Sequence, residues 1–555
     1  MTSQHSGVRP GFAWSAKDWP SERPSEDPGA LEAWVYTDRF SYFPGETIDF
    51  HLSGTVARAV LAVQRDGLHP ETVLEMEIGD LRCHPTPRDA YAEGCGWPVG
   101  RSWTVPADAV PGFHLVTIRA ELPDGRLWER EHFFVLKAPH ARPGRIVLVL
   151  PTSTLLAYND WGGANHYRGM GNDPRDDAGS PVLSTLRPIG RGLLRKPDGA
   201  PREADHGDLP VGGIPRYPAY EWARLNGYCR HHADAGWATY DRYFAIWAEE
   251  QGYGVDYLTQ HDLHFTPACL DGYDCAAIVG HDEYWSWPMR DVVDAFVDRG
   301  GGLARFAGNF LWQVRLSEDG TQQSCYRLPS LDPLAKDAPH LATTVWEARS
   351  VGRPAASTMG LSGLGGVITR YGVATPRSSG GFTVYRPGHW AFEGTDLYYG
   401  DVLGAAPAFL AAFEVDAVEF TFRRGLPYPT FEDGAPETLE ILALCPAVRG
   451  EEDRFGAAVP LGSPEAEMTD YAGELGDDLP AHIHEAGMYG AGMVAAFTRG
   501  KGEVFNGGST EWPHALAVRD PQTCRIVRNV LNRFGRASEL QASDEPARRA
   551  ADQRS

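Results

Sequence analysis

Four adjacent residues that can carry chemistry follow an apolar run near the middle of the chain. The segment at 280–290 reads GHDEYWSWPMR and places His281, Asp282, Glu283 and Tyr284 where the apolar run CAAIVG ends. Burying these polar groups is costly unless each is hydrogen-bonded, ion-paired or bound to a metal. His281 and Glu283 are two residues apart, so in an extended segment their side chains point the same way. A carboxylate beside an imidazole suits a general acid/base pair, or a metal ligand with its orienting partner.

The same residues also allow a structural interpretation. Asp282 or Ser286 can cap the helix predicted for MRDVVDAF, with Glu283 near the positive end of that helix. Composition alone leaves the chemical and the capping interpretations open.

The rest of the chain gives weaker chemical signals. The further candidates are His231, His232, His261, His264, His482, His484, Glu485 and Glu511. Histidines such as His231, His232, His261 and His264 more often cap helices or lie at the surface. His482, His484 and Glu485 form an HxH pair with an adjacent glutamate in an irregular acidic segment. Glu511 fits a structural cap. The sequence contains no GxSxG elbow, Walker A or HExxH motif.

Size and charge limit the classes of function. A chain of 555 residues predicts two or three domains, and a formal net charge of -23 argues against nucleic acid or an anionic membrane as partner. No stretch approaches the roughly 20 apolar residues that span a bilayer. Eight cysteines without a CxxC pair fit a reduced compartment. With no signal pattern at the N-terminus, the sequence predicts a cytoplasmic location.

An all-β domain is predicted over 31–138. AWVYTDRFSYFPGETIDFHLS alternates apolar and polar residues around a Pro-Gly turn, and GFHLVTIRAELPDGRLWEREHFFVLKA reads as a hairpin with an Asp-Gly turn. Short strands with this turn punctuation indicate an immunoglobulin-like β-sandwich. Residues 1–30 are predicted to be an N-terminal arm and residues 538–555 a disordered tail.

The pattern over 141–537 predicts an α/β catalytic domain. IVLVL and DCAAIVG are continuous apolar strands, and YDRYFAIWAEEQGYGVDYL reads as a helix followed by a strand. Strands that alternate with helices indicate a doubly wound, mostly parallel sheet of the amidotransferase-like kind. Ligands of such sheets bind at the carboxyl ends of the strands.

Three predicted strands end in polar or glycine-rich turns. The turn after IVLVL presents Tyr158, the turn after CAAIVG presents His281 and Glu283, and the turn after LARFAG presents Asn309. Because the carboxyl ends of parallel strands share one sheet edge, these side chains are expected to converge on a single site.

The ordered motifs resemble a known family. AYNDWGG, RPI, WAEEQGYGVDYLTQHDLH, GHDEYWS, GGGLARFAGNFLW and GEVFNGGSTEW together resemble the catalytic domain of the N,N-dimethylformamidase large-subunit family, over roughly 141–535. The resemblance implies a mononuclear Fe(III) held by two tyrosines and one glutamate. Phenolate and carboxylate oxygens are hard donors, which suits that ion.

The resemblance also implies roles for individual residues. Tyr158 and Glu283 match two of the metal ligands, His281 matches the histidine beside the glutamate, Asn309 matches a substrate-facing asparagine, and Glu414 of AFEVDA matches a further acidic residue more loosely. The second tyrosine follows the RPI segment in the family, where this chain has an apparent insertion. Tyr220 of PAYEW is the predicted second tyrosine ligand, and Tyr217 is its rival.

Two functions of different classes are compatible with these observations. The favoured one is a hydrolase that cleaves a small amide through an iron-activated water. The alternative is a non-enzymatic carbohydrate- or partner-binding protein on the same scaffold. A homo-oligomer and a small accessory subunit both fit the resemblance.

Overall fold

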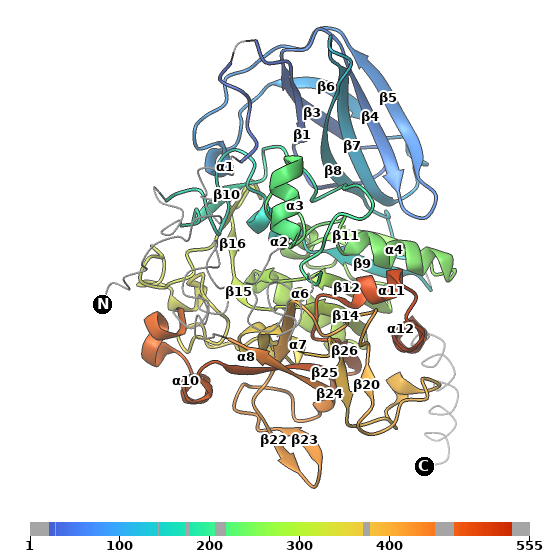
Figure 1. The fold of residues 1–555 in the computed structure, drawn as a ribbon, viewed down its shortest axis with the longest axis vertical. Coiled ribbons are helices and arrows are strands. Elements are labelled where there is room, and N and C mark those ends of the chain that lie inside the picture. Colours follow the sequence, from blue (N-terminus) through green and yellow to red (C-terminus); the bar gives the residue numbers. More distant parts are fainter. Residues whose placement is uncertain are drawn as a thin grey trace, which may run out of the picture.

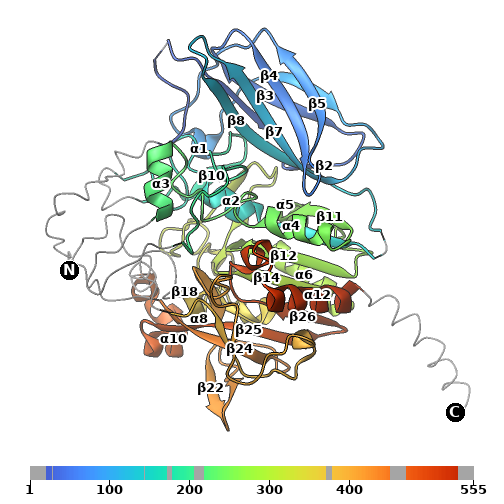
Figure 2. The same cartoon turned by 45° about the vertical axis from the view of Figure 1, so that its right-hand side comes forward.

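The computed structural model describes residues 21–27, 29–142, 144–171, 178–205, 218–369, 378–449 and 471–535. Most of the predicted N-terminal arm and all of the predicted tail at 538–555 lie outside these described residues. The N-terminal strands, coloured blue, gather at one end of the molecule, and the hairpin β22–β23 projects at the other (Figures 1 and 2). Within the described residues, no helix is long and apolar enough to cross a membrane.

Two β-sheets make up the N-terminal region. One has the order β1 (Ala33–Thr37), β3 (Thr47–Gly54), β6 (Val99–Thr104), and the other has the order β2 (Ser41–Tyr42), β8 (Leu127–Leu136), β7 (Gly112–Glu121), β4 (Ala59–Asp66), β5 (Glu71–Ile78). Alternating apolar residues such as Phe50, Leu61 and Phe134 fill one shared core. The predicted immunoglobulin-like sandwich fits only in part. The short strand β2 pairs with β8 in parallel.

The largest sheet has 11 strands, nine of them in one continuous order. That order is β11 (Val255–Thr259), β9 (Ile146–Leu150), β12 (Cys275–His281), β14 (Gly302–Gly308), β26 (Gly502–Asn506), β25 (Tyr489–Arg499), β24 (Glu440–Val448), β18 (Val367–Thr369) and β21 (Glu414–Ala417). The strands from β11 to β26 are parallel, and every later pair is antiparallel. Off this path, β19 (Phe382–Val384) pairs with β24 and β20 (Val402–Leu403).

The predicted doubly wound, mostly parallel sheet is wrong. In the part of the chain that the structure describes, 30% is strand and 21% is helix, and the sheets are mixed and antiparallel. The change from parallel to antiparallel pairing occurs at the hairpin between β25 and β26, where Arg499 pairs with Gly502 across a two-residue turn. Parallel neighbours need a crossover of about a dozen residues or more, so a turn this short enforces antiparallel pairing.

Helices cover both faces of the parallel strands. Successive residues of a strand point to opposite faces, so Leu148 packs in one core with Phe306, while Val147 packs in a second core with Ile278. The covering helices are α2 (Thr152–Tyr158), α4 (Asp241–Glu250), α5 (Gln260–Phe265), α6 (Trp287–Asp298), α11 (Trp512–Ala517) and α12 (Pro521–Gly535). A Cβ on Gly302 would lie 2.3 Å from the Phe534 ring, so α12 packs close to β14 only because a glycine stands there.

Shorter elements complete the fold. They are α1 (Ala90–Glu93), β10 (Val182–Ser184), α3 (Pro218–Asn226), β13 (Tyr284–Trp285), β15 (Trp312–Gln313), β16 (Arg315–Leu316), β17 (Gln322–Ser324), η2 (Pro339–Leu341), α7 (Ala356–Met359), α8 (Gly363–Gly366), η3 (Trp390–Phe392), β22 (Phe420–Arg423), β23 (Leu426–Pro429), η4 (Gly476–Asp478) and α10 (Ala481–Ala486).

Specific polar and aromatic contacts join the sandwich to the large sheet. Trp237 Nε1 donates to Asp66 at 2.7 Å, and the Trp237 ring stacks on Phe113 with centroids 3.9 Å apart. Lys137 Nζ donates to Asp262 at 2.6 Å. The sandwich is therefore packed firmly against the region that holds the strand ends.

Glu131 at this junction is expected to make folding sensitive to pH. Burial raises the pKa of Glu131 to about 7, and Arg195 lies 3.2 Å away. A carboxyl whose folded pKa exceeds its unfolded value of about 4.3 contributes stability that is complete below that value and is lost as pH rises through the folded pKa. We expect Glu131→Gln to flatten the pH dependence between about 4.3 and 7, and to stabilise the protein above pH 7 by about 1–3 kcal/mol.

Urea unfolding at several pH values from 5 to 8 tests this expectation. The matched control is Glu75→Gln, which changes a more exposed glutamate of the same sandwich that pairs with Arg119. If the free energy of unfolding of Glu131→Gln changed with pH as steeply as that of the wild type, the raised pKa of Glu131 would be contradicted.

Candidate active site

The predicted residues meet at one edge of the large sheet. The helix α2 follows β9 at once and ends at Tyr158, while β12 ends at His281 with Glu283 two residues later. Asn309 directly follows β14, and Glu414 begins the antiparallel strand β21. The strand ends thus bring together five of the six residues that the sequence and the resemblance select.

Two tyrosine hydroxyls converge on Glu283. The Tyr158 hydroxyl donates to Oε2 at 3.0 Å, and the Tyr167 hydroxyl lies 2.8 Å from both carboxylate oxygens. The two tyrosine rings stack with centroids 4.6 Å apart. A third hydroxyl, that of Tyr284, donates to the Tyr167 oxygen at 2.7 Å. Three oxygen-bearing side chains therefore form one buried cluster around this carboxylate.

A second group forms around Glu414. Its Oε2 accepts hydrogen bonds from His281 Nε2 at 2.5 Å and from Asn309 Nδ2 at 2.9 Å. His281 Nε2 also lies 3.4 Å from Glu283 Oε2, so the imidazole stands between the two carboxylates. The other ring nitrogen, Nδ1, donates to the backbone carbonyl of Asp234 at 2.7 Å, which fixes the orientation of the ring.

The backbone around these groups is held by side chains from neighbouring elements. Thr154 Oγ1 in α2 accepts from the backbone N–H of Glu283 at 2.9 Å. Asp416 in β21 accepts from the backbone N–H of Asn309 at 2.6 Å and is paired with Arg305. Asn309 has a φ of 62°, a left-handed conformation that asparagine adopts more readily than most residues. Residue type and position therefore agree at this turn.

The structure separates the capping role from the chemical one. Ser286 is the N-cap of α6 and accepts from the backbone of Met289. Asp282 is bound by Trp285 Nε1 at 2.7 Å and by Arg305 at 3.1 Å. Glu283 performs neither task, so its carboxylate remains available to the tyrosine cluster.

Burial dominates the electrostatics of the site. It raises the pKa of Glu283 to about 7 and, with Glu283 nearby, raises the pKa of Tyr158 and of Tyr167 well above the usual value. Burial alone would lower the pKa of His281, but Glu414 and Glu283 outweigh it and raise that pKa to about 10. The imidazole is therefore protonated at neutral pH and pairs with the Glu414 carboxylate.

Of the two tyrosines proposed for the insertion, Tyr220 lies near the site, since Phe413 contacts both Tyr220 and His281. Tyr220 is in α3 and packs with Phe413 and three alanines, and the Arg230 guanidinium carbon lies 5.0 Å from its ring. Tyr217 lies outside the described residues. Tyr167, which sequence reasoning passed over, is the residue next to Glu283. Its only signal is its position nine residues after Tyr158, in the loop that follows AYNDWGG.

The weaker candidates have structural partners. His482 pairs with Asp433 and Glu511 pairs with Arg202, while His261 and His264 hydrogen-bond to hydroxyl groups. His484 and His232 each hydrogen-bond to a backbone carbonyl. His231 differs, because its ring lies beside Tyr158 and Tyr167 with centroids 5.4 and 5.9 Å away.

In the part of the chain that the structure describes, no group of three or more histidine, cysteine, aspartate or glutamate side chains is arranged to hold a metal ion. The cluster around Glu283 is of another kind, since tyrosines supply two of its three donors.

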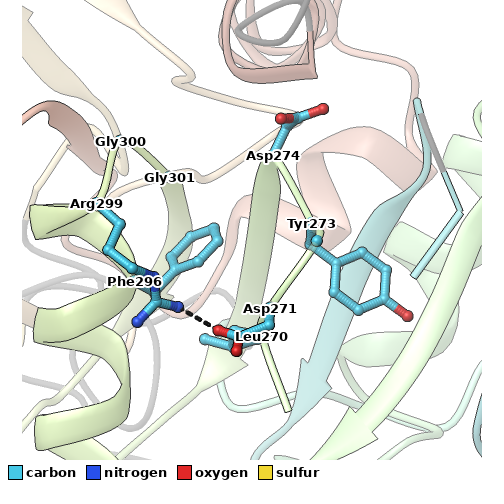
Figure 3. A pocket seen from close by; sticks show the side chains of 9 residues that line it. Leu270, Asp271, Tyr273, Asp274, Phe296, Arg299, Gly300 and Gly301 are labelled. Atoms are coloured by element: carbon cyan, nitrogen blue, oxygen red, sulfur yellow. Dashed lines mark hydrogen bonds and ion pairs between the residues drawn. The ribbon is translucent and has the colours of Figure 1, made fainter. Parts of the chain in front are cut away.

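A surface pocket of about 270 Å³ lies away from this site. Its lining includes Asp274 and Gly301, which directly precede β12 and β14, so it opens at the amino ends of these strands. Figure 3 shows Arg299 donating to Asp271 beside it, a contact of 2.6 Å. The pocket is thus at the sheet edge opposite the candidate active site.

Buried carboxylates, a paired imidazole and phenol groups with shifted pKa values, gathered where strands end, have the composition of an enzyme's catalytic centre. The chain belongs to the N,N-dimethylformamidase beta subunit-like, C-terminal family, whose model matches residues 62–525. This confirms the resemblance, and the match begins inside the N-terminal sandwich rather than after it. Membership indicates an amidohydrolase-like enzyme.

Individual proteins give more distant matches. No curated protein matches the chain. The sporulation control protein Spo0M of Bacillus subtilis is 15% identical over 21% of this chain and 51% of its own, with a TM-score of 0.14. The match thus spans about half of the Spo0M chain. The murine protein CRIg is 13% identical over 19% of this chain and 96% of its own, also with a TM-score of 0.14.

Proposed function

We propose that the chain is a ferric-iron-dependent hydrolase of a small amide. The observation that carries the proposal is the convergence of two tyrosines on Glu283 directly beside the ion pair of His281 and Glu414. Family membership supports amide hydrolysis as the reaction class.

The donor set fits the metal. Tyr158, Tyr167 and Glu283 would hold the ion, with Tyr167 in the role that the sequence assigns to Tyr220. Each phenol oxygen already lies within 3.0 Å of a Glu283 carboxylate oxygen, and both phenols donate protons that a metal would replace. All three are hard oxygen donors, as Fe(III) prefers. The Arg327 guanidinium carbon lies 4.1 Å from the Tyr167 ring centroid and offsets the negative charge of this set.

The ion pair would handle the protons of the reaction. When bound, a ferric ion supplies a hard Lewis acid that polarises a carbonyl or acidifies a water. Glu414 takes a proton from the attacking water and gives it to the amide nitrogen as the C–N bond breaks, which releases a carboxylic acid and an amine. His281, protonated at neutral pH, keeps Glu414 in place and stabilises the negative charge that grows on the carbonyl oxygen.

Asn309 receives a modified role. The resemblance assigns it to the substrate, where an amide N–H₂ suits an oxyanion. Its Nδ2 donates to Glu414, and its backbone is fixed by Asp416. The role that these contacts support is to position the Glu414 carboxylate.

Purified protein is expected to contain about one iron per chain and to show a visible tyrosinate-to-iron band, because Fe(III) prefers phenolate and carboxylate donors. Tyr167→Phe should abolish the band or shift it strongly and weaken iron binding at least about 10–100-fold, the scale for damage to a metal's surroundings. Elemental analysis and visible spectra of the same samples measure both.

Two further tyrosine variants complete this test. Tyr220→Phe is the matched comparison. Tyr228→Phe is the bystander, since the Tyr228 ring packs at a tilt against Trp222. Both are expected to keep the band. If Tyr220→Phe lost the band and Tyr167→Phe kept it, Tyr220 would be the ligand. Protein that binds only zinc would overturn the proposal.

A further inference from the structure

The hairpin β22–β23 forms a two-stranded sheet of its own and projects from the end of the molecule opposite the sandwich (Figures 1 and 2). Its strands meet at a two-residue turn, across which Arg423 pairs with Leu426. In such a hairpin the residues that flank the turn exchange backbone hydrogen bonds, and the next pair, Phe422 and Pro427, does not. The N–H and C=O groups of Phe422 and, two residues earlier, of Phe420 therefore point outward, away from β23.

The two outer edges of this hairpin differ. On β23 the outward positions are Pro427 and Pro429, which have no N–H, and the Pro427 carbonyl accepts from Arg386 at 2.8 Å. Proline on an outer strand is one way in which proteins block unwanted strand pairing. On β22 the outward groups of Phe420 and Phe422 have no hydrogen-bond partner in the part of the chain that the structure describes. One edge of the hairpin is thus closed, and the other is open to a further strand.

Aromatic side chains beside the open edge are exposed as well. Phe422 is 52% exposed, although its ring packs on Tyr385 and Phe420 with centroids 5.5 and 5.8 Å away. Tyr399 is 57% exposed, packs against Tyr385, and donates through its hydroxyl to the Gly425 carbonyl in the turn. Contiguous exposed aromatic surface beside an unpaired strand is typical of an interaction site.

The sequence along the open edge is complementary to itself. Residues 419–423 read EFTFR. If two copies of this segment run antiparallel with Thr421 of each at the centre, Phe420 faces Phe422 of the second copy, and each such pair exchanges its outward hydrogen bonds. Thr421 then faces its own copy and Glu419 faces Arg423 of the second copy, at positions where side chains lie closer together. Aromatic, threonine and opposite-charge pairs across antiparallel strands are all stabilising.

We propose that the open edge of β22 binds the same edge of a second copy of this chain, which gives a symmetric dimer with a sheet in the order β23–β22–β22–β23. Each chain uses the same surface, so the contact closes at two chains and does not continue into a filament. A chain with a formal net charge of -23 repels its own copy over much of its surface, so two copies meet best where positive and negative side chains are matched. The contact is small, so we expect a Kd on the order of 1–100 μM.

Sedimentation equilibrium of the full chain tests the dimer and its register. The wild type is expected to show particles of 60.8 kDa and of twice that mass, with the larger favoured as the concentration rises. Arg423→Glu should weaken the dimer at least about tenfold, because it places a glutamate opposite Glu419 of the second copy. Adding Glu419→Arg to Arg423→Glu should restore the dimer, because both opposite-charge pairs form again. Circular dichroism shows whether each variant is folded.

A cross-link tests the same register without removing a charge. Thr421→Cys would lie opposite its own copy at a Cα separation of about 4.5 Å, within the range of a disulfide, so mild oxidation with oxidised glutathione should join the chains. The matched control is Arg424→Cys, an exposed position in the turn that would lie about 20 Å from its copy. Cys83 is exposed in both proteins and gives both the same background.

The outcomes decide the proposal independently of catalysis. Wild-type protein that stays monomeric up to about 100 μM overturns it and leaves the open edge to a different protein. A dimer that is unchanged in Arg423→Glu, with no more cross-linking of Thr421→Cys than of Arg424→Cys, places the interface elsewhere and also overturns it. Both results leave the proposed hydrolase standing, because neither measurement involves turnover.

Discussion

Glu283→Gln is expected to retain less than about 1% of wild-type activity and no iron, because losing a general acid/base or ligand carboxylate costs about 10²–10⁴-fold. The carboxylate accepts from both Tyr158 and Tyr167 and is the centre of the donor cluster. A glutamine has one acceptor oxygen and no charge, so two phenolates would lack the partner that completes a three-oxygen set. The backbone around residue 283 stays bonded to Thr154, so the fold is expected to persist.

Ser286→Ala is the matched control for Glu283→Gln. Ser286 caps α6 only three residues away, so its loss should cost about 1 kcal/mol of stability while iron content stays unchanged. Iron analysis and the melting temperature, taken on the same samples, separate the two effects. If Glu283→Gln kept its iron and lost only stability, the carboxylate would be structural and the metal assignment would fail.

The sequence predicted the parallel half of the sheet better than the whole. Strands β9, β12 and β14 are short, mostly apolar runs buried on both faces, and such runs are easy to recognise in a sequence. Strand direction is a different property, which the turns decide. The segment that forms β25 and β26 is predicted as two strands of the main sheet, and only the two-residue connection between them makes them antiparallel. A prediction from periodicity alone assigned the whole domain to one doubly wound class.

The site shows the same division. Tyr158 and His281 are the last residues of α2 and β12, and Glu283 and Asn309 lie just after β12 and β14, so a rule about strand ends was enough to gather them. Tyr167 follows no such end. Its loop is shaped by hydrogen bonds of buried side chains, such as that from Asn165 to the Tyr158 carbonyl, and no periodic pattern reports them. Glu414 was selected only through the family resemblance. It begins an antiparallel strand 105 residues after Asn309, and no local sequence pattern marks it as a site residue.

Buried charge pairs explain how the fold tolerates this site. Arg305 is completely buried and pairs with both Asp282 and Asp416. Asp282 is adjacent to Glu283, and Asp416 is two residues from Glu414. In each of the two segments the paired aspartate anchors the backbone while the nearby glutamate remains turned to the site. Breaking a buried pair is strongly destabilising, so this arrangement fixes the two glutamates without using them.

Glu414→Gln is expected to lower kcat by about 10²–10⁴-fold, the contribution of a positioned proton carrier, while iron and the visible band remain. The reason is that Glu414 contacts His281 and Asn309 but none of the three oxygen donors around the proposed metal. The negative charge of Glu414 also helps to raise the pKa of His281 to about 10, so its removal should lower that pKa.

Steady-state kinetics, iron analysis and NMR titration of His281 measure the three consequences of Glu414→Gln separately. Glu432→Gln is the control, because that glutamate is largely exposed and pairs with His482 away from the site. A Glu414→Gln protein with more than about a tenth of the wild-type kcat would exclude Glu414 as the proton carrier. A variant that lost its iron would instead place Glu414 among the ligands. Retained iron with lost turnover is the one combination that assigns metal binding and proton transfer to different carboxylates, Glu283 and Glu414.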